Sequence, residues 1–206
     1  MELEPDPLFT GQLILRPFRR RDVDALTGAV RASINDLHEW LPWAHLGYGR
    51  IEAAHFVRES IKAWRETRAY DYCIRDRQDE ESLHLGNVSI WFVSRGFRTG
   101  EIGYWVRSDQ ASRGIATQAT ARLAQVGFDQ LKMHRIVLRI AVGNRASERV
   151  AEKLNFVREG ILREELKVRG SWLDHTVYSM LDHEFDRQRR HIADLVAGEQ
   201  PSVEGA

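Results

Sequence analysis

Residues 101–131 contain a short polar run, between an expected strand and an expected helix, of the kind that can bind an anion. Residues 102–106 (IGYWV) alternate as in a β-strand, and small or apolar residues then recur at helical spacing from Ala116 to Leu131. The run between them, residues 111–116 (ASRGIA), can present several backbone N–H groups at the N-terminus of the helix. Because such groups lack partners within the helix and the helix dipole is positive there, this end favours anions. An ordinary strand–turn–helix has the same pattern, so the residues alone leave both interpretations open.

The length and composition indicate one α/β domain. The chain has 206 residues, and its 30 basic and 30 acidic residues give a formal net charge of zero. No long-range field therefore attracts nucleic acid or an anionic membrane, and we expect neither as a partner. The single cysteine excludes an internal disulfide bond, and no apolar run approaches the roughly 20 residues of a membrane span. With an acidic N-terminus that is unlike a signal peptide, these features predict a cytoplasmic protein.

Several further elements are expected before the central strand. Cys73 falls within one of them, has no adjacent His or Cys, and is interpreted as a small buried hydrophobe. The expected elements are a strand at 12–16 that ends at Pro17, an amphipathic helix at 19–32, a tryptophan-containing turn within 33–49, a helix at 51–68, and antiparallel strands at 70–75 and 83–93.

After the central helix, Asn144 has the residue type of a helix N-cap, and Ser147 falls in the first turn of the helix that follows. Asn155 is a suitable left-handed stop for that helix. The expected elements are a strand at 134–142, a helix at 145–154, a hairpin of strands 160–168 and 171–181 that turns at Arg169–Gly170, a helix at 186–196 and a frayed tail at 198–206.

Four segments, in this order and spacing, resemble the GNAT acetyltransferase superfamily and its RimJ/RimL branch in particular. They are LILRP at 13–17, EIGYW at 101–105 with the loop that follows, N-x-x-S…V-x-x-K-x-N-F-x-x-E-G at 144–160, and G-x-W-x-D-H at 170–175. In the family's loop pattern, roughly Gln/Arg-x-x-Gly-x-Gly/Ala, Gly114 and Ala116 match the last two positions, whereas Ala111 stands at the first. Backbone amides, which any residue but proline supplies, can still hold a pyrophosphate there.

The resemblance implies a GNAT fold of the α/β (α+β) class. Its core would be a twisted, mixed and mostly antiparallel sheet with helices on both faces and a V-shaped splay between the two central strands. We expect a single acetyltransferase domain at residues 1–185, followed by a C-terminal helix and tail at 186–206. A homodimer is compatible with the sequence, which does not determine the oligomeric state.

The function implied is acetyl-CoA-dependent N-acetylation of a primary amine by direct attack in a ternary complex, with acetyl-CoA as co-substrate and no metal. The acceptor would be a protein N-terminus, such as that of a ribosomal protein, or a small amine such as an amino-acid derivative or an antibiotic. A non-catalytic acyl-CoA-binding scaffold is the alternative. A nucleotide-binding module is disfavoured because neither G-x-G-x-x-G nor G-x-x-x-x-G-K-S/T is present, and the eight histidines show no metal-ligand spacing.

The resemblance also assigns catalytic roles. Amine attack on a thioester needs a neutral amine, a stabilised carbonyl oxygen and a stabilised leaving thiolate. Glu101 is the candidate that accepts the proton of the amine, directly or through water, with Glu164 and Glu165 as alternatives. Ser147 is the candidate proton donor to the sulfur, and Asn144 the candidate that holds the pantetheine arm or a water molecule.

The expected cofactor site consists of backbone and side-chain groups from three segments. The central strand would pair with the pantetheine amides, and the following loop would cradle the pyrophosphate. The residues are Tyr104, Trp105, Val106, Ser112, Arg113, Gly114, Ile115, Ala116, Thr117, Asn144, Ser147 and Lys153. Trp40 and Trp43 would either form a wall of the acceptor groove or pack on the core.

Overall fold

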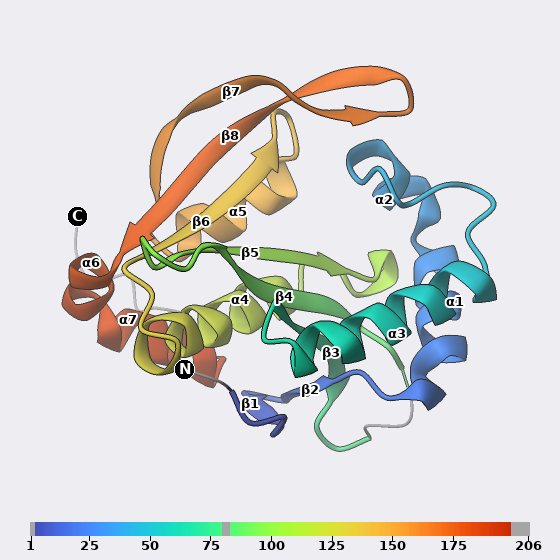
Figure 1. The fold of residues 1–206 in the computed structure, drawn as a ribbon, viewed down its shortest axis with the longest axis horizontal. Helices are drawn as coiled ribbons and strands as arrows, with labels where there is room; N and C mark the ends of the chain where they lie inside the picture. Colours follow the sequence, from blue (N-terminus) through green and yellow to red (C-terminus); the bar gives the residue numbers. More distant parts are fainter. Residues whose placement is uncertain (1–2, 80–82, 199–206) are drawn as a thin grey trace.

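One eight-stranded sheet carries helices on both of its faces in the computed structural model of the protein (Figure 1). The structure describes residues 3–79 and 83–198, so most of the expected frayed tail lies outside the described residues. In the described ranges no helix is long and apolar enough to cross a membrane. The strands are β1 (Leu8–Thr10), β2 (Leu13–Pro17), β3 (Ala69–Asp76), β4 (Gly86–Ser94), β5 (Thr99–Val106), β6 (Arg135–Ala141), β7 (Val157–Val168) and β8 (Ser171–Leu181).

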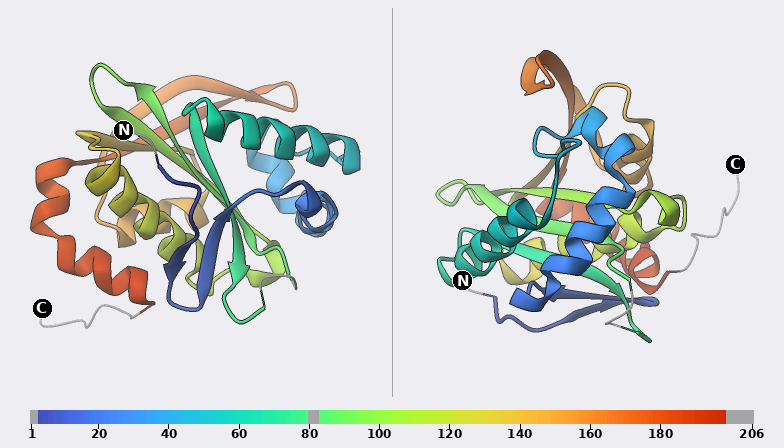
Figure 2. Two further views of the ribbon diagram at one scale, coloured as in Figure 1. Left: turned by 60° about the horizontal axis from the view of Figure 1, so that its bottom comes forward. Right: turned by 90° about the vertical axis from the view of Figure 1, so that its right-hand side faces the viewer.

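The helices lie in two groups, one on each side of the sheet, as Figure 2 shows for α1 and α3 against α4 and α7. The α-helices are α1 (Val23–Ala32), α2 (Ile34–Trp40), α3 (Arg50–Arg65), α4 (Ile115–Gln125), α5 (Arg145–Lys153), α6 (Asp182–Arg187) and α7 (Arg189–Ala197). Short 3₁₀ turns lie at Arg20–Asp22 and Ser108–Gln110, and a π-helical turn at Val126–Gln130 extends α4.

The sheet has the order β1-β2-β3-β4-β5-β6-β8-β7, and β5 and β6 form its parallel pair. That pairing joins residues 99–101 to residues 135–137. Beyond it, β5 stays paired with β4 as far as Val106, whereas β6 stays paired with β8 as far as Ala141. The two central strands therefore part in the middle of the sheet, which confirms the predicted V-shaped splay and the GNAT fold class.

Two apolar clusters pack against opposite faces of the sheet. On one face Leu123 of α4 packs with Ile90 and Ile136, and all three are fully buried. On the other face Leu26 of α1 and Val57 of α3 cover β3 and β5. The helices of that second face reach only part of the sheet, so charged side chains of β6 and β7 remain partly exposed there.

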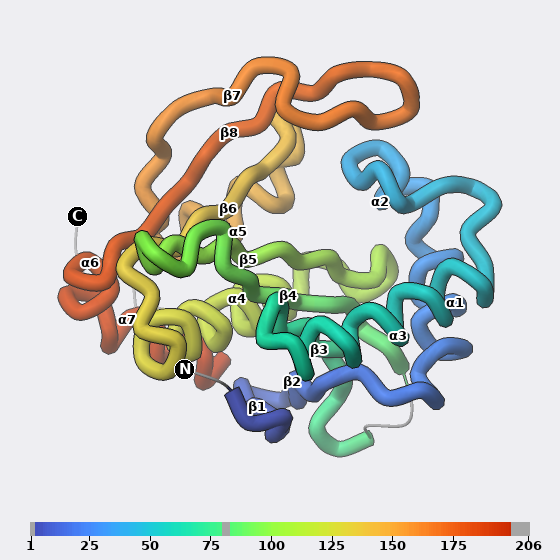
Figure 3. The backbone as a smooth tube through the Cα atoms, viewed as in Figure 1, coloured from blue at the N-terminus to red at the C-terminus, as the bar shows by residue number. Residues whose placement is uncertain are grey.

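Three elements near the N-terminus, in the blue part of the tube in Figure 3, differ from the sequence prediction. The helix predicted at 19–32 is shorter, because the Asp22 carboxylate accepts a hydrogen bond of 2.6 Å from the Arg19 N–H and holds a 3₁₀ turn before α1. The residues after it form α2 rather than a turn, since the Ser33 hydroxyl donates to the Ala29 carbonyl at 2.9 Å and redirects the chain. Strand β1 has three residues, too few for a pattern.

The predicted turn and helix stop at the C-terminal side are confirmed. Arg169 and Gly170 both have positive φ, at 49° and 84°, as the tight turn of a hairpin requires. Asn155 ends α5 in the left-handed region at φ 55°. Helix α7 packs along α4, and the Thr10 hydroxyl donates to the Val196 carbonyl at 2.5 Å.

A buried cluster of charges joins the first two long strands to the 3₁₀ turn before α1. Asp22 is 2% exposed and accepts two hydrogen bonds of 2.8 Å from Arg16 and one of 3.2 Å from Arg75. Burial alone would raise the pKa of Asp22. The hydrogen bonds from Arg16 and the Arg19 N–H, and the charges of Arg16 and Arg75, outweigh that effect and hold its pKa below the ordinary value.

We expect Asp22→Asn to lower the free energy of unfolding by about 3–5 kcal/mol, because it leaves two guanidinium groups in the interior without their carboxylate. Since the folded-state pKa of Asp22 is depressed, its contribution is complete above about pH 4 and is lost as the pH falls through the folded-state pKa. Urea denaturation across pH measures both effects. The control is Asp24→Asn, whose side chain is 75% exposed beside Arg50, with an expected loss below about 1 kcal/mol. Equal losses in the two variants would contradict this role of Asp22.

Candidate functional site

A cleft of about 720 Å³ opens where β5 and β6 part. Its walls come from the two strands, from the N-termini of α4 and α5, and from α2 and the β7–β8 hairpin. The structure brings most of the predicted cofactor residues together here. Those that line the cleft are Tyr104, Trp105, Val106, Ser112, Gly114, Ile115, Ala116, Thr117, Asn144, Ser147 and Lys153.

The loop before α4 turns so that its backbone faces the cleft. Ser112 and Gly114 have positive φ, at 62° and 78°, and the Gly114 carbonyl accepts the first helical hydrogen bond, from the Gln118 N–H at 2.9 Å. The N–H groups of residues 115–117 are in the first helical turn, where a helix offers donors without intrahelical partners. This end of the cleft can bind an anionic group through the backbone.

Cations line the same end of the cleft. Arg145, Arg149 and Lys153 lie on successive turns of α5 and all border the cavity. Arg113, predicted as a cofactor residue, is not among the lining residues and donates to the Gln110 side chain instead. The positive charge that can neutralise a phosphate therefore comes from α5 rather than from the loop.

The start of α5 is tied to β5 across the splay. The Asn144 side chain caps the helix by accepting from the Ser147 N–H at 3.2 Å, as predicted. The Tyr104 hydroxyl donates to the Ser147 carbonyl at 3.0 Å, and burial raises the pKa of this hydroxyl. These bonds engage backbone groups of Ser147 and leave its half-buried hydroxyl at the cleft wall.

Glu101 lies at the base of the splay in an ion pair with Arg139. The Glu101 residue is 7% exposed, and its two carboxylate oxygens accept from the Arg139 guanidinium at 2.6 and 3.1 Å. The same guanidinium donates to Glu165 at 2.6 Å. The hydrogen bonds with Glu101 raise the pKa of Arg139, which therefore stays charged.

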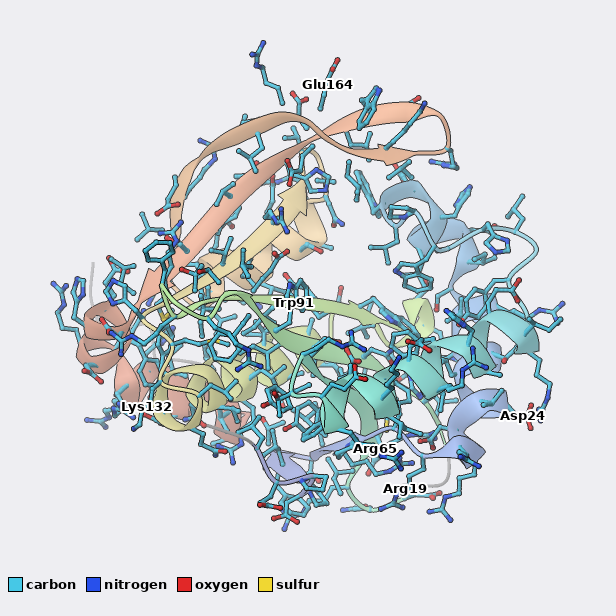
Figure 4. The ribbon with its side chains drawn as sticks, in the orientation of Figure 1. Arg19, Asp24, Arg65, Trp91, Lys132 and Glu164 are labelled. Carbon is cyan, nitrogen blue, oxygen red and sulfur yellow. The ribbon has the colours of Figure 1, made fainter. Side chains whose placement is uncertain are left out.

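The three candidate bases, Glu101, Glu164 and Glu165, differ in where their carboxylates lie. Arg139 lines the main cleft and a second, adjacent groove, whereas Glu101 lines only the second groove. Glu165 lies near Glu101 because both carboxylates bind the Arg139 guanidinium. Glu164, in contrast, lies on the outer side of the hairpin and points away from the sheet (Figure 4).

Trp91 and Gly103 form a contact beside Glu101 that sequence patterns did not reveal. Trp91 is directly opposite Glu101 in the β4–β5 ladder. A Cβ atom on Gly103 would lie 3.2 Å from the indole ring of Trp91, so the ring lies across the glycine on the open face (Figure 4). A glycine within a strand signals such a close approach, and this signal could have identified the pair.

One end of the cleft, where the sequence predicts the acceptor groove, lies between α2 and the β7–β8 hairpin. Trp40 lines it and approaches Gly143, whereas Trp43 packs on Trp105 with ring centroids 6.2 Å apart. The predicted pair of tryptophans is thus divided between the cleft wall and the packing behind it. At the rim, Arg169 of the hairpin turn donates to His38 of α2 at 2.8 Å.

Other lining residues escaped prediction because contact between distant segments, not local pattern, places them. For Arg139 a signal existed: it alternates with the buried Leu138 and Ile140, so it must face the other side of the sheet. The remaining lining residues without a sequence signal include Asp36, Leu37, Leu41 and Leu166, whereas His175 belongs to the G-x-W-x-D-H segment.

The described residues give no support for a reactive cysteine or for a metal site. Cys73 is fully buried, and burial raises the pKa of its thiol to about 11, so it stays protonated, as expected of a buried hydrophobe. Within residues 3–79 and 83–198 no cluster of three His, Cys, Asp or Glu side chains is arranged to hold a metal ion.

Comparisons with known proteins agree with this geometry. A family model described as an acetyltransferase (GNAT) domain matches residues 12–157. The putative ribosomal N-acetyltransferase YdaF of Bacillus subtilis (strain 168) is 28% identical over 178 residues, which cover 86% of this chain and 95% of that protein.

Solved structures are similar over most of the chain. Mycobacterium smegmatis RimJ in complex with CoA-disulfide is 27% identical, with a TM-score of 0.76, and the match covers 90% of this chain and 96% of RimJ. RimL, a ribosomal L7/L12 alpha-N-protein acetyltransferase in complex with coenzyme A, has a TM-score of 0.79 at 22% identity, covering 87% of this chain and 99% of RimL. The second similarity concerns the fold alone.

We expect Gly114→Ala to weaken acetyl-CoA binding by about tenfold, because an alanine at φ 78° strains the loop whose backbone faces the cleft. Gly170→Ala is the matched control, since Gly170 has φ 84° and no atom within 4 Å of an added Cβ, while the nearest atom at Gly114 is the Gln118 Nε2 at 3.6 Å, an ordinary contact. Both variants should lose about 1 kcal/mol of unfolding free energy. Calorimetric titration with acetyl-CoA separates them, and equal affinities in the two variants would exclude the loop from the binding site.

Proposed function

The chain belongs to the GNAT acetyltransferase family, and we propose that it acetylates the N-terminal amine of a protein by direct attack in a ternary complex with acetyl-CoA. The observation that carries the proposal is the arrangement at the splay. A buried Glu101 carboxylate lies at its base, bound to Arg139, and Arg139 borders the cleft with the cationic end. Both substrates can be held side by side, so positioning supplies much of the acceleration.

Acetyl-CoA would occupy the cleft, where the backbone and the charges fit its chemistry. Residues 115–117 would hold the pyrophosphate through their N–H groups, with Arg149 and Lys153 neutralising phosphate charge. The edge of β5 at residues 104–106 would pair with the pantetheine amides, because β6 no longer pairs with it there. When bound, acetyl-CoA supplies the reactive thioester.

Glu101 would accept the proton that the amine must lose, directly or through one water molecule. Arg139 positions this carboxylate through two hydrogen bonds. As the amine nitrogen bonds to the acetyl carbon, the carbon–sulfur bond breaks and the thiolate needs a proton. The Ser147 hydroxyl at the cleft wall can donate it, and solvent can restore the hydroxyl proton.

The choice of a protein N-terminus rests on the relatives and on the charges at the acceptor end. YdaF, which this chain matches over 95% of its length, is a putative ribosomal N-acetyltransferase. The Arg139 guanidinium already binds Glu101 and Glu165. It therefore offers little to the carboxylate of a free amino acid, whereas a peptide N-terminus has an uncharged amide at that place.

Glu101→Gln should lower the acetylation rate by about 100-fold at neutral pH, because proton acceptance by a positioned base has an effect of this order. The ratio of wild-type to variant rate should rise as the pH falls below about 8, where an α-amine is mostly protonated. Release of free CoA thiol from acetyl-CoA and peptide measures the rate. A ratio that stays flat across pH would contradict the role of Glu101.

Two matched controls accompany this variant. Glu164→Gln changes the neighbouring carboxylate that points away from the sheet, and it should leave the rate unchanged (Figure 4). Glu165→Gln removes the second carboxylate held by Arg139 and tests whether the base role is shared. Acetyl-CoA affinity, measured on each variant, should be unchanged because none of the three carboxylates lines the cofactor cleft.

The acceptor itself is tested with N-terminal peptides, a free amino acid and spermidine in the same assay. We expect turnover of peptides with kcat/KM at least about tenfold above the other amines. Turnover of only the free amino acid or spermidine would refute the proposed acceptor and leave the enzyme class unaffected.

A further inference from the structure

A second groove of about 410 Å³ lies on the open face of the sheet, next to the cleft. Its walls come from β4, the start of β5, β6, β7 and β8, on the side that α1 and α3 do not reach. The apolar residues that form these walls are Val93, Val137, Ile161, Leu162 and Val177. On this face of the sheet, these apolar side chains share the groove wall with Thr99, Glu101, Arg139, Glu159 and Gly160.

The groove begins at the proposed catalytic carboxylate. Glu101 lines it, and Arg139 lines both the groove and the cleft. An amine that gives its proton to Glu101 must lie at this boundary. The groups attached to the carbon beside that amine therefore have the groove directly in front of them.

The charges along the groove are paired with one another. Arg139 binds Glu101, and Arg135 donates to Glu159, which also accepts from the Ser179 hydroxyl at 2.7 Å. Within the described residues each carboxylate that lines the groove thus has a guanidinium partner. A groove with neutralised charges and apolar walls suits an uncharged apolar group, not a phosphate or a carboxylate.

The apolar walls are in contact with water in the free protein. Val93, Ile161 and Leu162 are 56%, 47% and 39% exposed. Covering such surface with an apolar side chain is favourable, and the gain is lost with a small or polar one. The groove can therefore distinguish acceptors by the side chain next to the amine.

We propose that the groove is the subsite for the first side chain of the acceptor peptide and that it selects a branched apolar residue, such as leucine or isoleucine. The inference rests on the proposed function, since it needs a peptide whose amine meets Glu101. Trp91, the residue paired with Glu101 in the β4–β5 ladder, has its ring over Gly103 beside the start of this groove.

The test uses peptides that are identical except for their first residue, which is Leu, Ile, Ser or Gly. Thiol release with the full-length enzyme gives kcat/KM for each peptide. The wild type should prefer the Leu and Ile peptides over the Gly peptide by at least about tenfold, a typical discrimination for an apolar pocket. The difference should lie mainly in KM, because the groove contacts the acceptor and not the reacting atoms.

Two variants test whether the groove causes the preference for the Leu and Ile peptides. Val177→Phe fills the groove from β8, and Leu162→Asn, on the exposed edge strand β7, makes its wall polar without filling it. Each should bring the Leu to Gly ratio of kcat/KM close to one. Ile51→Phe, at an 83% exposed position of α3 outside both cavities, adds an aromatic ring elsewhere and should keep the wild-type ratio.

The outcomes distinguish a failure of this inference from a failure of the proposed function. Turnover of all peptides with equal kcat/KM would overturn the inference alone, as would a preference that both groove variants retain. A mass in solution that falls from dimer to monomer in Val177→Phe, with the preference unchanged, would mean that a second copy covers the groove and would overturn it too. Turnover of no peptide would refute the proposed acceptor and the inference together.

Discussion

The parting of two strands in the middle of a sheet is the constraint on which the rest of this structure depends. Backbone N–H and C=O groups in a sheet need partners, and β5 loses its partner β6 after three residue pairs. The structure leaves the freed edge facing a cleft of about 720 Å³ rather than filling the gap with side chains. The N-termini of α4 and α5 both border this cleft, so donors from three elements converge on one ligand-sized space.

The two sides of the splay differ in charge, and this difference agrees with the proposal that they hold different substrates. Arg149 and Lys153 border the cleft on the side proposed for the cofactor, where a phosphate needs cations, and Arg145 beside them is paired with Glu148. On the open face, Glu101 and Glu159 are each neutralised by an arginine, and apolar residues lie between them. The protein can therefore bind a polyanion on one side and, close to it, an amine that carries an apolar group on the other. Arg139 is the one cation that borders both cavities among the described residues.

Local patterns predicted the parts of the fold that local physics determines. The alternation of residues 102–106, the Asn144 cap and the left-handed stop at Asn155 each follow from neighbours in sequence, and all three are confirmed. Helix α2 was missed because seven residues give too few apolar repeats. The ion pair of Glu101 with Arg139 and the contact of Trp91 with Gly103 depend on which strands are neighbours, and one sequence does not state that order. Arg113 was assigned to the site for its backbone and for its charge, and its side chain donates to Gln110.

The most direct test of the account is calorimetric titration of the protein with acetyl-CoA, with desulfo-CoA and ATP as comparators. The splay offers hydrogen bonds to the pantetheine arm as well as to the pyrophosphate. Acetyl-CoA and desulfo-CoA should therefore bind with dissociation constants well below about 1 mM, the upper end of usual substrate affinities. ATP, which lacks the arm, should bind much more weakly. Failure of acetyl-CoA to bind at about 1 mM, or equal affinity for ATP, would contradict the claim that the parted strands form the cofactor site.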